Sequence, residues 1–297
     1  MNPTLDALNT RFTIPQQVHF EDQTVGLPVA HISTPHGTAR VSLYGGHVLS
    51  WQPAGQQPVI WVSPAAIYAT GTAIRGGVPV CWPWFGSVPG KVSHGFARTS
   101  VWQVRGTDVA TDGVATLRLG LQDDAHTRTL WPHAFDLELV VTVGPTLTLA
   151  LSTRNTGDTP FTITQALHTY FCVGDIAQTV VHGLDGGQYL DKPRDFAQFA
   201  QTGPVTFSDE VDRVYIDTTG DCVIEDSALQ RSIRVAKSGS TSTVVWNPWA
   251  EREKAMVDMA TGDYKGMVCV ETCNAGPDRI VVGPHAAHTL SATFSVA

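Results

Sequence analysis

The sequence predicts an all-β protein, built as one large antiparallel β-sandwich with few short helices. Apolar residues alternate with polar or small residues in several segments, which is the pattern of strands with one buried face. The 297 residues include 27 glycines and 18 prolines, so turns are frequent and strands are short. Helical periodicity is weak, and strands do not alternate with helices as they would in a parallel α/β sheet. Together these observations favour two packed antiparallel sheets.

The clearest strands lie in the middle and at the end of the chain. Leucine and valine alternate with other residues over 137–143 and 147–151, and Gly144-Pro145 between these runs predicts a hairpin turn. The same spacing marks residues 117–121 and 290–296. Further strands are expected at 39–44, 58–62, 161–173, 213–217, 231–236, 242–246 and 266–272. Short helices are expected at 4–11 and 63–67.

No repeat, low-complexity tract or linker-like stretch divides the chain, so residues 1–297 are expected to form a single domain. Lys and Arg number 19 against 27 Asp and Glu, and the net charge of −8 argues against nucleic-acid binding. No uncharged apolar run reaches the roughly 18 residues of a membrane span, and the N-terminus lacks a signal-peptide pattern. We therefore expect a cytoplasmic protein that binds neither nucleic acid nor membrane, with a monomer as the default state.

The cysteines favour a reducing compartment and no metal site. There are five, an odd number, and their spacing fits no zinc template. We expect all of them to be reduced and mostly buried thiols. They are Cys81, Cys172, Cys222, Cys269 and Cys273.

The most unusual segment is IRGGVPVCWPWFG, at residues 74–86. Pro79 and Pro83 prevent it from continuing as a regular strand, so we expect a rigid loop lined by aromatic side chains. Arg75 is its one charged residue. From the residues alone, the segment fits a hydrophobic plug with Arg75 in solvent as well as it fits a functional loop.

A second segment, SHGFARTSVW at residues 93–102, places His94 and Arg98 four positions apart. With Arg75 they could donate hydrogen bonds to an anion, and arginine suits a phosphate because its guanidinium donates two parallel hydrogen bonds. A salt bridge of Arg98 and a structural hydrogen bond of His94 fit the spacing equally well. Neither glycine-rich nucleotide-binding pattern occurs, so any bound phosphate is expected to belong to a small substrate.

The alternation in ITQALHTYFCVGD, residues 163–175, places His168, Tyr170 and Cys172 on one face of a strand. An imidazole titrates near neutral pH and therefore suits proton transfer. A histidine inside an apolar strand is more often a hydrogen-bonded core residue. The pattern alone leaves both roles open.

The segment GMVCVETCNA, residues 266–275, carries Glu271 on the same face as Met267, Cys269 and Cys273. A carboxylate in such surroundings is costly unless it is paired or solvated in a cleft. Its pKa is then expected to rise, which would make it a usable general base. The alternative is a glutamate that reaches solvent at a strand end. We favour a functional role.

Two further segments could contact a sugar. Asp212 comes directly before the strand expected at 213–217, and VVWNPWA at 244–250 holds Trp246 and Trp249 around Asn247-Pro248. Aromatic faces with polar neighbours suit a sugar ring, which has an apolar C–H face and hydroxyl groups at its edge. Either tryptophan also fits a core position.

Taken in this order, IRGGVPVCWPWFG, SHGFAR, LHTYFCVGDI, DRVY, VVWNPW and VCVET resemble the glucose-6-phosphate 1-epimerase family, a branch of the aldose 1-epimerase (galactose mutarotase-like) superfamily. The resemblance spans residues 74–272 and continues more weakly toward both ends. It implies a large antiparallel β-sandwich with a cleft on the concave face of one sheet. It also implies a reaction, the interconversion of the α and β anomers of a hexose 6-phosphate, chiefly glucose 6-phosphate. The chain departs from the family pattern mainly in loops 183–191 and 272–279, which bear on the choice of sugar.

The resemblance implies roles for individual residues as well. His168 matches the catalytic histidine of the family, and Glu271 matches its catalytic glutamate. Anomer exchange needs a base at the C1 hydroxyl and an acid at the ring oxygen, and Glu271 as carboxylate and His168 as imidazolium fit these roles. No electron or group is transferred, so no cofactor and no metal is expected. The positions that match the substrate and phosphate site are Arg75, His94, Arg98 and Asp212.

Three alternatives stay open. The first is an aldose 1-epimerase that acts on unphosphorylated sugars, which the two arginines disfavour. The second is glycoside hydrolysis by Asp212 and Glu271, which the nearby His168 disfavours. The third is a non-enzymatic sugar-phosphate binding protein. The presence of both the acid and the base disfavours it.

Overall fold

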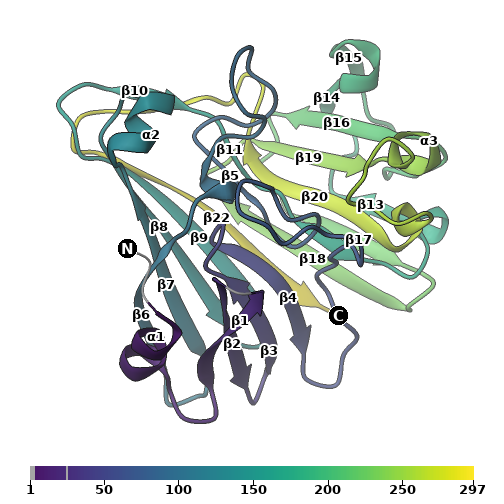
Figure 1. The fold of residues 1–297 in the computed structure, drawn as a ribbon. Helices are drawn as coiled ribbons and strands as arrows, with labels where there is room; N and C mark the ends of the chain where they lie inside the picture. The colour runs from purple at the N-terminus through teal and green to yellow at the C-terminus, as the bar shows by residue number, and fades with distance from the viewer. Residues whose placement is uncertain (1–3, 25) are drawn as a thin grey trace.

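The computed structural model describes residues 4–24 and 26–297, and it is dominated by antiparallel β-sheets (Figure 1). One eight-stranded sheet carries the candidate site, and we call it the site sheet. Its strand order is β15 (Ala197–Ala200), β14 (Gln188–Asp191), β16 (Val211–Ile216), β19 (Ser242–Asn247), β20 (Met267–Asn274), β11 (Gln165–Leu167) and β5 (Val80–Cys81), with β12 (Tyr170–Cys172) also paired to β20.

The second eight-stranded sheet packs against the site sheet and is called the covering sheet. Its order is β13 (Thr179–His182), β17 (Cys222–Asp226), β18 (Arg231–Ser238), β22 (Ala287–Val296), β9 (Leu147–Asn155), β8 (Phe135–Val143), β7 (Ala115–Gln122) and β6 (Gln103–Val109). A four-stranded sheet of β1 (Val18–Thr24), β2 (Leu27–Thr34), β3 (Gly37–Ser42) and β4 (His47–Pro53) lies over β7–β9, with β3 on β8 (Figure 1). A short pair joins β10 (Phe161–Ile163) and β21 (Ile280–Val282).

Helices are few and short, as the sequence predicts. The α-helices are α1 (Leu5–Phe12), α2 (Ala125–Leu130) and α3 (Trp249–Glu253), and the 3₁₀ turns are η1 (Ala97–Thr99), η2 (Ile176–Gln178), η3 (Lys192–Arg194) and η4 (Asp263–Gly266). Helix α1 confirms the helix expected at 4–11, and its first turn is capped by the Thr4 side chain. Among the described residues, none of the helices has the length and apolar character needed to cross a membrane.

The period-two alternation builds the core as predicted. Every second residue of β8 and β9 is buried, and these inward positions include all the leucines and valines of the sequence pattern. The hairpin at Gly144-Pro145 is present, because Val143 pairs with Leu147 across it. One apolar cluster joins both eight-stranded sheets, the four-stranded sheet and α1. The predicted all-β sandwich is therefore confirmed.

Three of the expected elements differ in the structure. Residues 58–62 form no named strand, and only single bridges join Ile60 to Phe171 and Val62 to Gly76. Residues 63–67 form a turn instead of a helix, because the Ser63 hydroxyl accepts the amide of Ala65 at 3.1 Å. The strand expected at 161–173 is divided into β10, β11 and β12.

The break between β11 and β12 falls at His168 and Thr169. The His168 amide donates to the Pro79 carbonyl at 3.1 Å, and the Thr169 amide turns back to Leu167 at 2.9 Å. Neither amide therefore joins the ladder with β20. The alternation survives the break, because Leu167 and Phe171 still face the core while Tyr170 packs on the opposite face of the sheet.

The packing between the two large sheets gives a stability prediction. Phe171 in β12 is fully buried and meets Phe294 in β22 edge to face, with ring centroids 5.0 Å apart. Phe171→Ala is expected to lower the free energy of unfolding by about 3–5 kcal/mol, because it removes a buried aromatic ring and leaves a cavity. Denaturant unfolding measures this loss.

A matched control is available at Val281, which is 68% exposed. Val281→Ala should change the free energy of unfolding by less than about 1 kcal/mol. A loss for Phe171→Ala that is no larger than this control would contradict the assigned packing.

Candidate active site

Strand β20 presents a chemically unusual face at the centre of the site sheet. Met267 and Cys269 pack beside Tyr170, whereas Cys273 packs beside Cys81 on the same side. The intervening valines of β20 belong to the main core. Glu271 lies between the two cysteines on this outward face and is only 1% exposed. The predicted face is confirmed, and Glu271 is buried in mid-strand where the sequence left a solvent-exposed strand end as an alternative.

His168 faces Glu271 across the break between β11 and β12. Its Nε2 lies 3.4 Å from Glu271 Oε1, and the residue is 9% exposed. The His168 Nδ1 and Glu271 Oε2 atoms are buried and have no hydrogen-bond partner in the described part of the chain. Each group of the pair therefore keeps a free polar atom for a bound molecule.

Aromatic rings fix the orientation of the His168 imidazole. The Tyr170 ring stacks on it, with centroids 4.9 Å apart and an interplanar angle of 10°. The Trp246 ring meets it edge on at 6.0 Å, and the Phe85 ring does so at 6.3 Å. The His94 ring also lies next to it, with the two imidazole centroids 5.9 Å apart.

The environment shifts both members of the pair away from their charged forms. Burial raises the pKa of Glu271 well above its ordinary value, and the charge of Asp212 raises it further. Burial also lowers the pKa of His168 well below its ordinary value, followed by the effect of His94. Oppositely shifted neighbours of this kind are typical of acid–base catalytic pairs.

Arg75 is held in place by two partners instead of pointing into solvent. Its Nη1 donates to the Tyr170 hydroxyl at 2.9 Å, and its Nη2 pairs with Asp258 at 3.1 Å. Tyr170 therefore connects Arg75 to the imidazole on which it stacks. Asp258 lies in the loop after α3, where no sequence pattern identifies it. Tyr170 stands on the predicted face with His168, but the sequence assigned it no role.

Two glycines of the recognised motifs let the loops approach the sheets. A side chain at Gly77, whose φ is +69°, would meet the His47 ring and the Val48 carbonyl within 2.4 Å. At Gly95, with φ +72°, it would meet the Trp82 carbonyl at 2.0 Å. Only glycine fits these two positions. The loops that carry Arg75 and His94 are thereby held against the core.

His94 and Arg98 lie on the loop that follows β5 in the chain. The His94 Nδ1 accepts the Gly86 amide at 3.3 Å, and burial lowers the pKa of His94 to about 3. Arg98 lies in η1, where its Nη2 donates to the Ser93 carbonyl at 2.8 Å. Its buried Nε has no partner, and none of the ion pairs found in the described residues involves Arg98. Arg98 thus keeps donors for an anion.

Asp212 lies at the start of β16 and is buried beside a lysine. Lys192 in η3 donates to its carboxylate at 2.7 Å. Asp212 pairs in register with Trp246, which in turn pairs with Cys269. Lys192 was not predicted from the sequence, because a single lysine in a polar stretch carries no distinguishing signal. Trp249, the other candidate for sugar contact, packs on Tyr264 instead.

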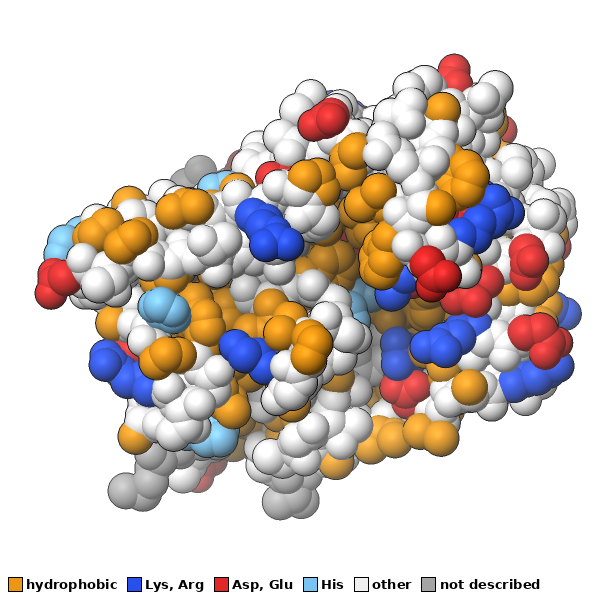
Figure 2. Space-filling view, turned by 90° about the horizontal axis from the view of Figure 1, so that it is seen from above, with side chains coloured by type: hydrophobic (Ala, Val, Ile, Leu, Met, Phe, Trp, Pro, Cys, Tyr) orange, Lys and Arg blue, Asp and Glu red, His pale blue; other side chains and the backbone are white. Residues whose placement is uncertain are grey.

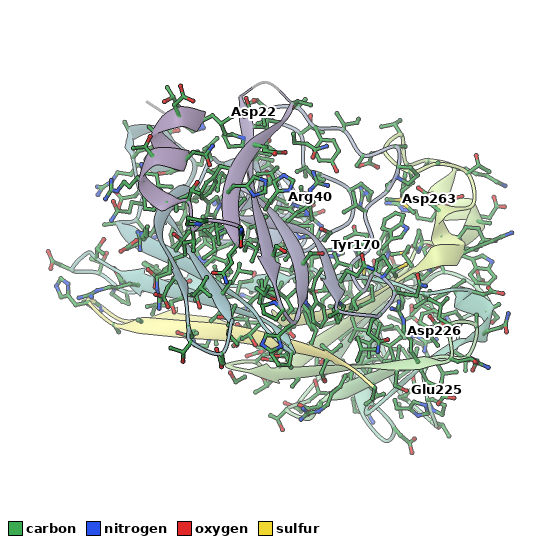
Figure 3. All side chains as sticks on the ribbon, turned by 90° about the horizontal axis from the view of Figure 1, so that it is seen from below. Asp22, Arg40, Tyr170, Glu225, Asp226 and Asp263 are labelled. Atoms are coloured by element: carbon green, nitrogen blue, oxygen red, sulfur yellow. The ribbon has the colours of Figure 1, made fainter. Side chains whose placement is uncertain are left out.

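The structure brings all six predicted site residues into one neighbourhood. His94, Arg98 and Arg75 each influence the pKa of His168, and Asp212 influences that of Glu271. The face shown in Figure 2 is hollowed, and a histidine and basic side chains stand at the wall of this hollow. Tyr170 and Asp263 are both labelled in Figure 3. Asp263, in η4, accepts a hydrogen bond from the Ser63 hydroxyl at 2.8 Å and so fixes the neighbouring loop. This grouping offers an acid, a base and several cations to a small anionic molecule.

His168 and Glu271 also belong to a candidate set of metal ligands. Donor atoms of His168, Cys269 and Glu271 all lie within 4.8 Å of one another. The Cys269 thiol is fully buried, and burial raises its pKa well above the ordinary value. A protonated thiol is a poor metal ligand. A metal ion bound here would have to displace the proton of this thiol.

Comparison with known proteins places this geometry in context. The model of the family described as aldose 1-epimerase matches residues 28–295. A protein of Escherichia coli strain K12 named "Putative glucose-6-phosphate 1-epimerase" is 41% identical over 260 residues, which cover 86% of this chain and 86% of that protein. A protein of the same name from Cenchrus ciliaris is 37% identical, covering 78% and 74% of the two chains.

Solved structures of mutarotase-like proteins match this chain as well. The crystal structure of a "putative mutarotase (YeaD)" from Salmonella typhimurium matches with a TM-score of 0.90 and 36% identity, covering 96% of this chain and 95% of that one. A galactose mutarotase-like protein from Clostridium acetobutylicum matches with a TM-score of 0.74 at 14% identity, covering 94% and 98%, which shows a common fold.

The lowered pKa of His168 gives a prediction that needs no substrate. We expect its imidazole to stay neutral at pH values well below 6.5, because burial penalises the charged form. NMR of labelled histidine, with the His168 signal identified by its loss in His168→Gln, would show no titration step near pH 6.5. The same residue in urea-unfolded protein serves as the control and should titrate at a pH of about 6.5. A native-state step at the unfolded value would contradict the assigned environment.

Proposed function

Because the chain belongs to the aldose 1-epimerase family, we propose that it interconverts the α and β anomers of hexose 6-phosphates, chiefly glucose 6-phosphate. The observation that carries this proposal is the buried pair of His168 and Glu271, whose Nε2 and Oε1 atoms lie 3.4 Å apart beneath a group of cations. The pair supplies the acid and the base of the reaction. One of these cations, Arg98, supplies the phosphate anchor.

Anomer exchange requires the hemiacetal ring to open and close again. Burial favours the neutral form of each group, so the free pair holds its one proton on Glu271. Transfer of that proton to His168 gives the reacting form, in which Glu271, as carboxylate, takes the proton from the C1 hydroxyl, and His168, as imidazolium, gives its proton to the ring oxygen. The bond between C1 and the ring oxygen breaks, and an aldehyde forms. After rotation about C1–C2, the two groups reverse their roles, and the ring closes as the other anomer. The pair carries one proton before and after, so no other acid or base is consumed.

Burial of the pair assists ring opening. The raised pKa of Glu271 makes its carboxylate a stronger base, and the lowered pKa of His168 makes its imidazolium a stronger acid. Opening the ring converts the ionised pair into a neutral carboxyl and a neutral imidazole. These are the forms that a buried site favours, so both proton transfers run in the direction that relieves the cost of burial.

Arg98 is the best candidate for the phosphate anchor. Arg75 is already paired with Asp258, and Lys192 is paired with Asp212. Arg98 has no such carboxylate partner in the described chain, and its Nε is buried without a hydrogen bond. A guanidinium in this condition gains most from a phosphate, which accepts two parallel hydrogen bonds.

The sugar ring has partners on the site sheet. Asp212 and Trp246 pair in register on neighbouring strands, so the carboxylate and the indole lie side by side. The Trp246 ring also meets the imidazole of His168. We assign Trp246 to the apolar C–H face of the sugar and Asp212 to its hydroxyl groups.

We further propose that residues 1–297 fold as one domain and work in a reducing, cytoplasmic compartment. A single apolar cluster reaches from Leu8 to Phe294 and includes all three larger sheets. All five cysteines are free thiols, and four of them are buried.

The decisive experiment follows anomer exchange of freshly dissolved α-glucose 6-phosphate by NMR, with the spontaneous rate subtracted. The wild-type protein should accelerate the exchange, and free glucose should be a much poorer substrate. Glu271→Gln should lower kcat by roughly 10²–10⁴-fold, because the amide cannot accept the proton. The melting temperature of this variant controls for folding.

The outcomes are distinct. Equal or faster exchange of free glucose would assign the protein to unphosphorylated sugars. Near-wild-type turnover of the folded Glu271→Gln variant would remove Glu271 from the mechanism. Acceleration of neither sugar would leave a sugar-phosphate binding protein, which calorimetric titration would test.

The phosphate assignment gives a separate prediction for Arg98→Ala. The KM for glucose 6-phosphate should rise by about 10- to 100-fold, which corresponds to the loss of charge-assisted hydrogen bonds worth about 1.5–3 kcal/mol. The KM for free glucose should change little. Arg128→Ala serves as the control, because this substitution also removes one positive charge. Arg128 pairs with Asp123 at the surface, at helix α2. Equal effects of Arg98→Ala on both sugars would count against a phosphate role.

A further inference from the structure

A second cluster of possible ligands lies on the four-stranded sheet, away from the catalytic pair. His19 in β1 stands directly opposite His31 in β2, and Glu21 lies two residues after His19 on the same strand face. The His19 Nε2 lies 3.2 Å from Glu21 Oε1, and the His31 Nε2 lies 3.7 Å from Glu21 Oε2. Both imidazoles therefore direct the same nitrogen toward one carboxylate.

The two imidazoles are also aligned with each other. Their centroids are 4.9 Å apart, and their planes differ by 16°. Donor atoms of all three side chains lie within 4.8 Å of one another. The side chains of His19 and Glu21 are 52% and 62% exposed, so an ion can reach them from solvent without opening the fold.

We propose that His19, Glu21 and His31 form a surface site for a divalent transition-metal ion of the zinc class. Two imidazole nitrogens and one carboxylate oxygen form a ligand set that suits Zn²⁺, with water in the remaining position. Magnesium and calcium prefer sets made of oxygen atoms, so this site disfavours them. The arrangement is independent of the proposed epimerase activity.

The backbone prepares this ligand set. Strand register fixes His19 opposite His31, so binding requires side-chain rotation and no chain movement. Because β1 is the edge strand of its sheet, an ion bound here would fasten that edge to β2.

One cation opposes the ion and limits its affinity. Arg40 in β3 lies opposite His31 and hydrogen-bonds to the Gln23 side chain (Figure 3). Its positive charge repels a second cation on the same face. Arg40→Gln should therefore tighten metal binding, which a site elsewhere on the molecule would not show.

The chain offers a matched control for the imidazole pair. His182 and Glu225 also form an exposed histidine–carboxylate pair, with Nε2 and Oε2 2.8 Å apart on neighbouring strands β13 and β17. No third ligand completes a set with them in the described residues. Loss of His182 removes one surface histidine without touching the proposed site.

The test is calorimetric titration of Zn²⁺ into tag-free, full-length protein. Wild type should bind one ion at this site, and His19→Gln and His31→Gln should each weaken it at least about tenfold, because each removes a direct ligand. His182→Gln should bind as wild type does, and Mg²⁺ should give no binding. Unchanged melting temperatures of the metal-free variants show that they fold.

Two results would overturn the proposal. One is the absence of saturable Zn²⁺ binding to wild type. The other is binding that is the same in wild type, His19→Gln and His31→Gln, which would place the ion elsewhere. Failure of the epimerase proposal itself would leave the titration unaffected.

Discussion

The proposed function depends on a carboxyl group and an imidazole that are buried together. Glu271 and His168 lie 3.4 Å apart and are almost completely removed from water. Burial by itself disfavours the charged form of each, which makes the carboxylate a better base and the imidazolium a better acid. For the proposed reaction, the surrounding structure must hold these two groups at this distance and admit one small molecule.

The register of the site sheet performs most of that task. Tyr170, Cys269, Trp246 and Asp212 stand in one row across four neighbouring strands. Backbone hydrogen bonds fix the spacing of such a row to about 4.8 Å per strand, so the side chains need little further support. The break after β11 then turns His168 toward Glu271, because its amide bonds to Pro79 and leaves the ladder.

The sequence predicted those residues of the candidate site whose placement depends on local pattern. Alternation placed Glu271 and its cysteines on one face, and unusual composition marked the loops of Arg75, His94 and Arg98. It could not reveal Asp258 or Lys192, since each is a common residue in a polar loop whose role depends on a partner far along the chain. Residues 58–62 read as a strand but pair with the core only through single bridges, which tertiary packing decides.

The charges of the cleft are divided in a way that explains how a protein of net charge −8 can receive an anion. Asp258 pairs with Arg75, and that pair orients the tyrosine beneath the imidazole. Asp212 pairs with Lys192, and that pair stands beside Trp246, which we propose to contact the sugar. Each of these cations is already compensated, so neither draws an anion strongly. Arg98 has no carboxylate partner in the described chain, so the proposed phosphate site concentrates its attraction for the anion at one guanidinium. Because the charge of Arg98 also lowers the pKa of His168, a phosphate bound to Arg98 would offset that effect and favour the imidazolium form that the proposed ring opening requires.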